Sequence, residues 1–157
     1  MSHRSFVSAM LALALGAFTP APATAQAPAV VLKGDVKVVR QVTENGKSVE
    51  KLEEPAQVLP GDRLLFATTY TNNGAEAVTD FVVVNPLPPA VKLASAEALE
   101  VSVDGGKRFA ALNALKVPGT DGTTRPAELG DVTHVRWRIA SIAPGASGKV
   151  QYFAEVR

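Results

Sequence analysis

Few residues of this chain have the types and spacing that catalysis requires. The 157-residue sequence contains no cysteine, and His134 is the one histidine beyond its first few residues. Without a cysteine, a histidine cannot join a thiol nucleophile pair or a zinc cluster of the usual composition. No serine stands in a Gly-x-Ser-x-Gly elbow. We therefore expect His134 to be a solvated or cross-strand residue, and we predict no catalytic and no cofactor-binding residue.

Several aspartates stand close to turn signals and could supply oxygen ligands to a calcium ion. Their spacing is not that of a calcium-binding loop, and capping of the local turn explains each of them separately. We predict no metal ligand, although calcium binding by these side chains stays an open alternative. The aspartates are Asp80, Asp104, Asp121 and Asp131.

Three apolar residues are the best candidates for contact with a partner. Val82, Val84 and Phe153 fall on the outward register of their predicted strands. An apolar patch rimmed by polar groups is typical of a contact surface. The alternative is that the long segment Leu115–Asp131, or the hairpin at Asn45-Gly46, covers them.

The central element that positions these residues is the stretch Leu59–Asn73. Pro60-Gly61-Asp62 predicts a turn, and Asn72-Asn73-Gly74 predicts the end of a strand, because Asn and Gly tolerate positive φ. Between the two, side chains alternate between two faces as in a β-strand. One face carries Leu64, Phe66, Thr68 and Tyr70.

The segment before this strand predicts an edge of the same sheet. Val30–Val42 is expected to form one strand or two short ones, with a bulge or kink at Gly34-Asp35. Asn45-Gly46 favours a tight hairpin turn, and Val49–Leu52 is the expected return strand.

Short alternating segments separated by turn signals continue to the end of the chain. Trp137 alternates with two arginines and is expected to point into the core rather than to serve as a platform for a sugar. Leu115–Asp131 is expected to be rich in loops. No long segment of helical period follows residue 25, so we predict an all-β, immunoglobulin-like antiparallel β-sandwich. The further predicted strands are Val78–Val84, Val91–Ser95, Glu100–Asp104 with Arg108–Ala111, Val135–Ile139 and Val150–Val156.

The order of these motifs resembles the bacterial conserved-repeat family known as domain of unknown function number eleven. The matching residues are Pro60-Gly61-Asp62 before a strand that ends at Asn72 and Gly74, Asn85-x-Leu87-Pro88, and Trp137 followed by Pro144-Gly145. The resemblance covers Leu59–Val156 and implies an immunoglobulin-like module of the cell surface. Asn85 stands where the family usually has an aspartate.

A second resemblance is local. Ser102–Phe109 is similar to the Asp-box, Ser-x-Asp-x-Gly-x-x-aromatic, of sialidase propellers. In that motif the aspartate bonds backbone N–H groups of its own turn. The resemblance implies a structural hairpin and no glycosidase activity.

The first 25 residues have the layout of a secretory signal. Arg4 precedes the apolar run Phe6–Ala17, which is shorter than the roughly 20 residues of a spanning helix, and Ala23-Thr24-Ala25 offers a cleavage site. We therefore predict a signal peptide over residues 1–25 and one domain over 26–157. Its N-terminal strands and hairpin occupy 26–58, and the conserved-repeat-like core occupies 59–157.

Charge narrows the class of partner. Removal of Arg4 with the signal leaves 15 of the 16 basic residues against 15 acidic ones, a formal net charge of zero. A neutral chain without a basic face argues against nucleic acid. We expect a periplasmic or cell-surface protein that is not integral to the membrane and that contacts itself or another envelope protein without catalysis. The alternatives are a carbohydrate-active or carbohydrate-binding protein, and a subunit that assembles by strand donation.

We predict that the exported protein begins at Gln26, because the Ala-x-Ala site ends at Ala25. N-terminal sequencing of the protein from an envelope fraction checks this. Recovery of a cytoplasmic product that still contains Phe6–Ala17 would contradict it.

Overall fold

The computed structural model describes residues 29–120 and 122–157, and within them the regular structure is strand apart from two single turns of 3₁₀ helix. All strand pairs are antiparallel. The predicted all-β sandwich is confirmed, whereas the predicted signal peptide lies outside the described residues. Within those residues, no helix is long and apolar enough to cross a membrane. The strands are β1 (Val30–Glu44), β2 (Lys47–Glu53), β3 (Arg63–Asn72), β4 (Val78–Pro86), β5 (Val91–Leu93), β6 (Glu100–Ser102), β7 (Lys116–Pro118), β8 (Thr124–Pro126), β9 (His134–Ile142) and β10 (Ser147–Val156), and the 3₁₀ turns are η1 (Leu112–Ala114) and η2 (Leu129–Asp131).

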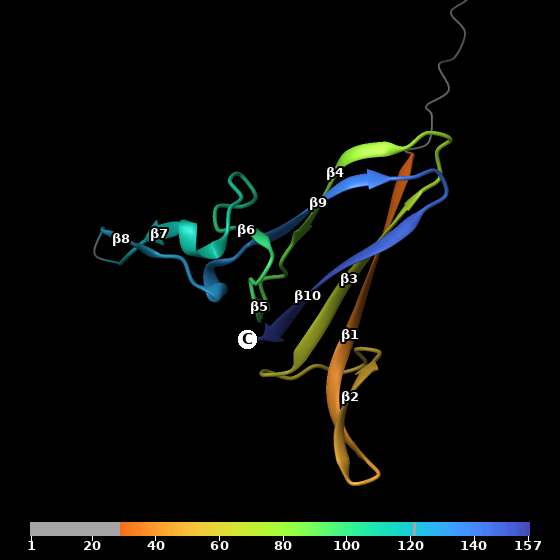
Figure 1. Cartoon of the computed structure of the whole chain (residues 1–157). Coiled ribbons are helices and arrows are strands. Elements are labelled where there is room, and N and C mark those ends of the chain that lie inside the picture. Colours follow the sequence, from red (N-terminus) through yellow and green to blue (C-terminus); the bar gives the residue numbers. More distant parts are fainter. Residues whose placement is uncertain (1–28, 121) are drawn as a thin grey trace, which may run out of the picture.

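The strands form two main sheets and one small hairpin (Figure 1). The larger sheet has the order β2-β1-β3-β10-β5, and the smaller sheet has the order β4-β9-β6. Strand β3 is the middle strand of the larger sheet, as its alternating sequence predicts. Strands β7 and β8 pair only with each other and project to one side of the molecule in Figure 1.

The turn before β3 has the predicted chemistry. Gly61 has φ of +88°, and a carboxylate oxygen of Asp62 accepts a hydrogen bond from the backbone N–H of Leu59 at 2.9 Å. The other oxygen of Asp62 lies 2.6 Å from Arg40 of β1. Both contacts lower the pKa of Asp62. The hydrogen bond from Arg40 is the larger cause, and the hydrogen bond from the Leu59 N–H is the next. The turn therefore ties the start of β3 to the base of the β1–β2 hairpin.

Strand β3 ends at Asn72, but not because of positive φ, as was predicted. Asn72 and Gly74 are not among the residues with positive φ. Instead, Asn72 is fully buried and its side-chain amide donates to the carbonyls of Glu76, at 2.8 Å, and of Ile142, at 2.9 Å. Its side-chain oxygen accepts from the N–H of Gly74 at 2.9 Å. The strand ends because this amide directs the chain toward the other sheet.

Strand β1 is one continuous strand, so the predicted bulge at Gly34-Asp35 is wrong. Its pairing with β3 runs from Val30 to Val39 without a break in register. A glycine in a strand marks either a bulge or a site where another backbone approaches closely, and the sequence alone does not separate the two. The Asn45-Gly46 turn is confirmed, since both residues have positive φ, 52° and 78°.

The core lies between the inner faces of the two sheets. The ring of Tyr152 stacks on Phe66 with centroids 4.9 Å apart and lies 6.1 Å from the ring of Trp137 on the smaller sheet. Burial raises the pKa of Tyr152 to about 12. Trp137 points inward as predicted, but it is only partly buried against the core.

The segment Leu115–Asp131 has more order than its turn signals predict. It contains the β7–β8 hairpin, whose strands have three residues each. The hairpin closes where the N–H of Ala127 donates to the carbonyl of Leu115 at 3.0 Å, and both of these residues are buried in the core. Strands so short, with a proline at the end of each, carry no readable alternation.

We predict that Trp137→Ala lowers the free energy of unfolding by about 2–4 kcal/mol, because it removes the aromatic contact with Tyr152 from a partly buried site. His134→Ala, on the opposite face of β9, should change it by less than about 1 kcal/mol. Urea unfolding of both variants measures the difference. A larger loss for His134→Ala would contradict the inward position of Trp137.

Candidate functional site

The outer face of the smaller sheet presents apolar side chains between charged ones. Val82 and Val84 of β4 point away from the buried Val83 and are 40% and 42% exposed. In the pairing with β9, Val82 lies opposite Arg138 and Val84 lies opposite Arg136. We call these four residues, together with Glu100 and Phe109, the valine–arginine face.

Glu100 of β6 organises the two arginines of this face. One of its oxygens accepts from Nε of Arg136 at 2.9 Å and from Nε of Arg138 at 3.2 Å. The hydrogen bond from Arg136 is the main reason that the pKa of Glu100 is lowered. The guanidinium of Arg136 also lies 4.3 Å from the centre of the Phe109 ring, at cation–π distance. One carboxylate thus serves two cations, and the face keeps an excess positive charge.

The structure separates the three predicted contact residues. Phe153 belongs to β10 of the larger sheet, and it alternates with Tyr152 and Ala154, both of which are buried in the core. It therefore lies on the outer face of the other sheet, with the guanidinium of Arg63 4.0 Å from its ring centre. Val82 and Val84 are together, and Phe153 is not with them.

Neither Leu115–Asp131 nor the hairpin at Asn45-Gly46 covers the two valines. Both valines are well exposed, and the β7–β8 hairpin and the β1–β2 hairpin project away from β4 in Figure 1. Phe153 is half-buried and contacts Arg63 of the neighbouring strand.

The turn beside the valine–arginine face has the geometry of the Asp-box pattern. One carboxylate oxygen of Asp104 accepts from the N–H groups of Lys107, at 3.1 Å, and Arg108, at 3.0 Å, and from the hydroxyl of Ser102 at 2.7 Å. These bonds, with that to Arg108 the largest cause, lower the pKa of Asp104. His134 lies against Gly106 in the same turn, and its ring nitrogen is 3.1 Å from the hydroxyl of Thr133. His134 therefore has a cross-strand position, as predicted.

The turn aspartates are not gathered into one site. Asp131 forms a bidentate pair with Arg125, at 2.7 and 2.8 Å, and caps the backbone of Glu128. Asp80 is exposed on β4, and Asp121 lies outside the described residues. In the part of the chain that the structure describes, no group of three or more His, Asp or Glu side chains could bind a metal ion.

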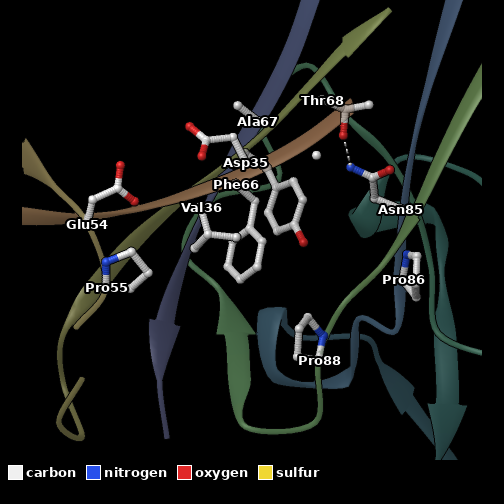
Figure 2. A pocket seen from close by; sticks show the side chains of 12 residues that line it. Asp35, Val36, Glu54, Pro55, Phe66, Ala67, Thr68, Asn85, Pro86 and Pro88 are labelled. Atoms are coloured by element: carbon white, nitrogen blue, oxygen red, sulfur yellow. Dashed lines mark hydrogen bonds between the residues drawn. The ribbon is translucent and has the colours of Figure 1, made fainter. Parts of the chain in front are cut away.

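A cleft of about 470 Å³ opens between the two sheets near β1 (Figure 2). Val36 and Phe66 line one side of it, and Pro86 and Pro88 line the other. The side chain of Asn85 lines the cleft and donates to the hydroxyl of Thr68 at 2.7 Å. The cleft is therefore mainly apolar, with one hydrogen bond that joins the sheets.

Two carboxylates lie at the mouth of this cleft, and both are in contact with Lys37. Lys37 donates to Glu54 and lies 3.6 Å from Asp35. The bond to Glu54 is the main reason that the pKa of Lys37 is raised. Hydrolysis of a glycoside needs one carboxyl group that delivers a proton and one that attacks or activates water. Here one lysine contacts both carboxylates.

The sequence did not single out Glu100 or Phe109 as part of a surface. Arg136 and Arg138 alternate with inward residues, which indicates a solvated face but not its neighbours. Their position beside Val82 and Val84 depends on the register of β4 against β9, which a single sequence does not specify.

We predict that Asp104→Asn lowers stability at neutral pH and that this difference narrows in acid. The folded pKa of Asp104 is lower than its ordinary value of 3.8, so its ionised form stabilises the fold above that pH. The contribution is lost as the pH falls through the lowered folded value. Urea midpoints at pH 7 and below pH 3.8 measure both effects. Asp80→Asn, at an exposed position, is the control. If the difference in urea midpoint between Asp104→Asn and the wild type were the same at both pH values, the prediction would be contradicted.

Comparison of the chain with protein-family models, with curated proteins and with solved structures found no match. The resemblance to the conserved-repeat family therefore stays a prediction from the motifs.

Proposed function

We propose that this protein is a non-enzymatic, exported immunoglobulin-like module that makes protein–protein or structural contacts in the bacterial envelope. The observation that carries the proposal is the valine–arginine face. The same proposal places the protein in the conserved-repeat family and in the periplasm or at the cell surface. These two parts of the proposal rest on the sequence motifs.

The composition of the face supports contact with a protein. Protein interfaces are enriched in arginine and aromatic residues and combine an apolar centre with a polar rim. Val82 and Val84 supply the apolar centre, while Arg138 and Glu100 supply the rim. The side chain of Arg138 is 62% exposed and is available for an acidic group on a partner.

The arrangement of the charges supports preorganisation. Glu100 and the ring of Phe109 restrain Arg136 from two sides. A side chain that is already restrained loses less conformational entropy on binding. The partner we propose therefore carries an apolar segment beside at least one carboxylate.

Photo-crosslinking in the intact envelope tests this function. A photoreactive residue at Val82 should form one discrete adduct, and the added change Arg138→Glu should lower the yield of that adduct severalfold. Lys149, which is exposed on the outer face of the larger sheet, is the matched control position. Adducts of equal yield from Lys149, or none from Val82, would contradict a contact at this face.

A further inference from the structure

Half of β1 has a free backbone edge. β3 pairs with β1 from Val30 to Val39 on one side, whereas β2 pairs with it on the other side only from Val38 to Glu44. Within residues 29–120 and 122–157, no strand pairs with the second side of Val30–Lys37. Unpaired N–H and C=O groups along an edge are a template for another strand.

Residues 31–35 of this edge are exposed. Val31 and Leu32 are 45% and 47% exposed. Gly34 has open space beside it, because no heavy atom beyond its chain neighbours lies within 4 Å of the place where a Cβ would stand. A glycine in the middle of a strand allows another backbone to approach closely. Lysines commonly protect such edges from pairing, and here Lys33 is exposed whereas Lys37 is half-buried.

The sequence of the edge is self-complementary when Gly34 lies opposite its own copy. When two copies pair antiparallel about a two-fold axis normal to the sheet, residues that lie opposite each other have their side chains on the same face. One residue must therefore lie opposite its own copy, with the axis between the two. With the axis at Gly34, Lys33 lies opposite Asp35 of the second copy, twice over. On the other face, Leu32 lies opposite Val36 of the second copy, also twice.

The neighbouring registers are unfavourable. An axis at Lys33 places that lysine opposite its own copy. An axis at Asp35 places Asp35 opposite its own copy and Lys33 opposite Lys37. Like charges directly opposite each other destabilise a strand pair, and opposite charges stabilise it. Only the register centred on Gly34 turns Lys33 from a protecting charge into half of an ion pair.

The two faces of the edge also match. Lys33 and Asp35 lie on the outer face, where Asp35 is 3.6 Å from Lys37. Leu32 and Val36 lie on the inner face, and Val36 lines the cleft between the sheets. A two-fold axis normal to the sheet keeps inner faces on one side. Leu32 of a second copy would therefore lie beside Val36 at the edge of the cleft.

We propose that two copies of this protein pair edge to edge through Leu32–Val36 of β1, with Gly34 on the two-fold axis, and form one continuous sheet. This contact is separate from the valine–arginine face and does not depend on it. It also differs from strand donation, because β1 keeps its whole pairing with β3.

Charge exchange between copies tests the register. Sedimentation equilibrium of the wild type should show a reversible dimer. Lys33→Asp alone places two aspartates opposite each other, and Asp35→Lys alone places two lysines opposite each other, so each variant should dimerise about tenfold more weakly or worse. An equimolar mixture of the two single variants should recover the dimer, because every facing pair is then of opposite charge. The double variant should recover it as well.

The controls separate this contact from others. Lys149→Asp and Glu97→Lys make the same changes of charge at exposed positions away from the edge and should leave the dimer intact. Strand donation would place Lys33 and Asp35 opposite Thr69 and Ala67 of β3, as they are within one chain, so it predicts no recovery specific to the mixture. A wild type that is monomeric at all concentrations would overturn the proposal. So would a dimer unaffected by the single variants, or single variants that stay monomeric when mixed.

Discussion

The buried amide of Asn72 is the interaction on which the arrangement of the two sheets depends. It ends β3 in the larger sheet and donates to Ile142 at the end of β9 in the smaller one. Its backbone N–H and C=O also bond to Ala146 and Gly145 in the turn that leads into β10. In a chain without cysteine, this amide has the position of a cross-link between sheets. Each buried polar group left unpaired there costs about 1–3 kcal/mol, so few side chains could replace it.

The opposite side of the sandwich is held more loosely. There, the bond from Asn85 to Thr68 and the contact of Trp137 with Tyr152 join the sheets next to an apolar cleft. The cleft opens where β1 has no neighbour on its second side. The end of the sandwich at Asn72 is thus closed by a hydrogen-bonded polar group, whereas the side with the cleft and the free edge of β1 remains available for contact.

Local chemistry could be predicted from the sequence, and spatial neighbours could not. The Pro60-Gly61-Asp62 turn, the Asn45-Gly46 turn and the inward direction of Trp137 each depend on one or two residues and their alternation. The grouping of Phe153 with Val82 was wrong for a physical reason. Alternation tells which residues share a face of one strand, but not to which sheet that strand belongs. Gly34 shows the same limit, because an open edge and a bulge both favour glycine.

The β7–β8 hairpin has a consequence for how this chain can vary. Its ends meet at the bond between Ala127 and Leu115, and both residues are anchored in the core. Because this base is closed, the positions of the strands in the two sheets do not depend on the number of residues in the β7–β8 hairpin. Doubling a closed loop costs only about 0.6 kcal/mol of chain entropy. The β7–β8 hairpin is therefore the site at which the protein can be lengthened without disturbing either sheet. Such an insertion could arise in evolution or be engineered, as an epitope or a second domain.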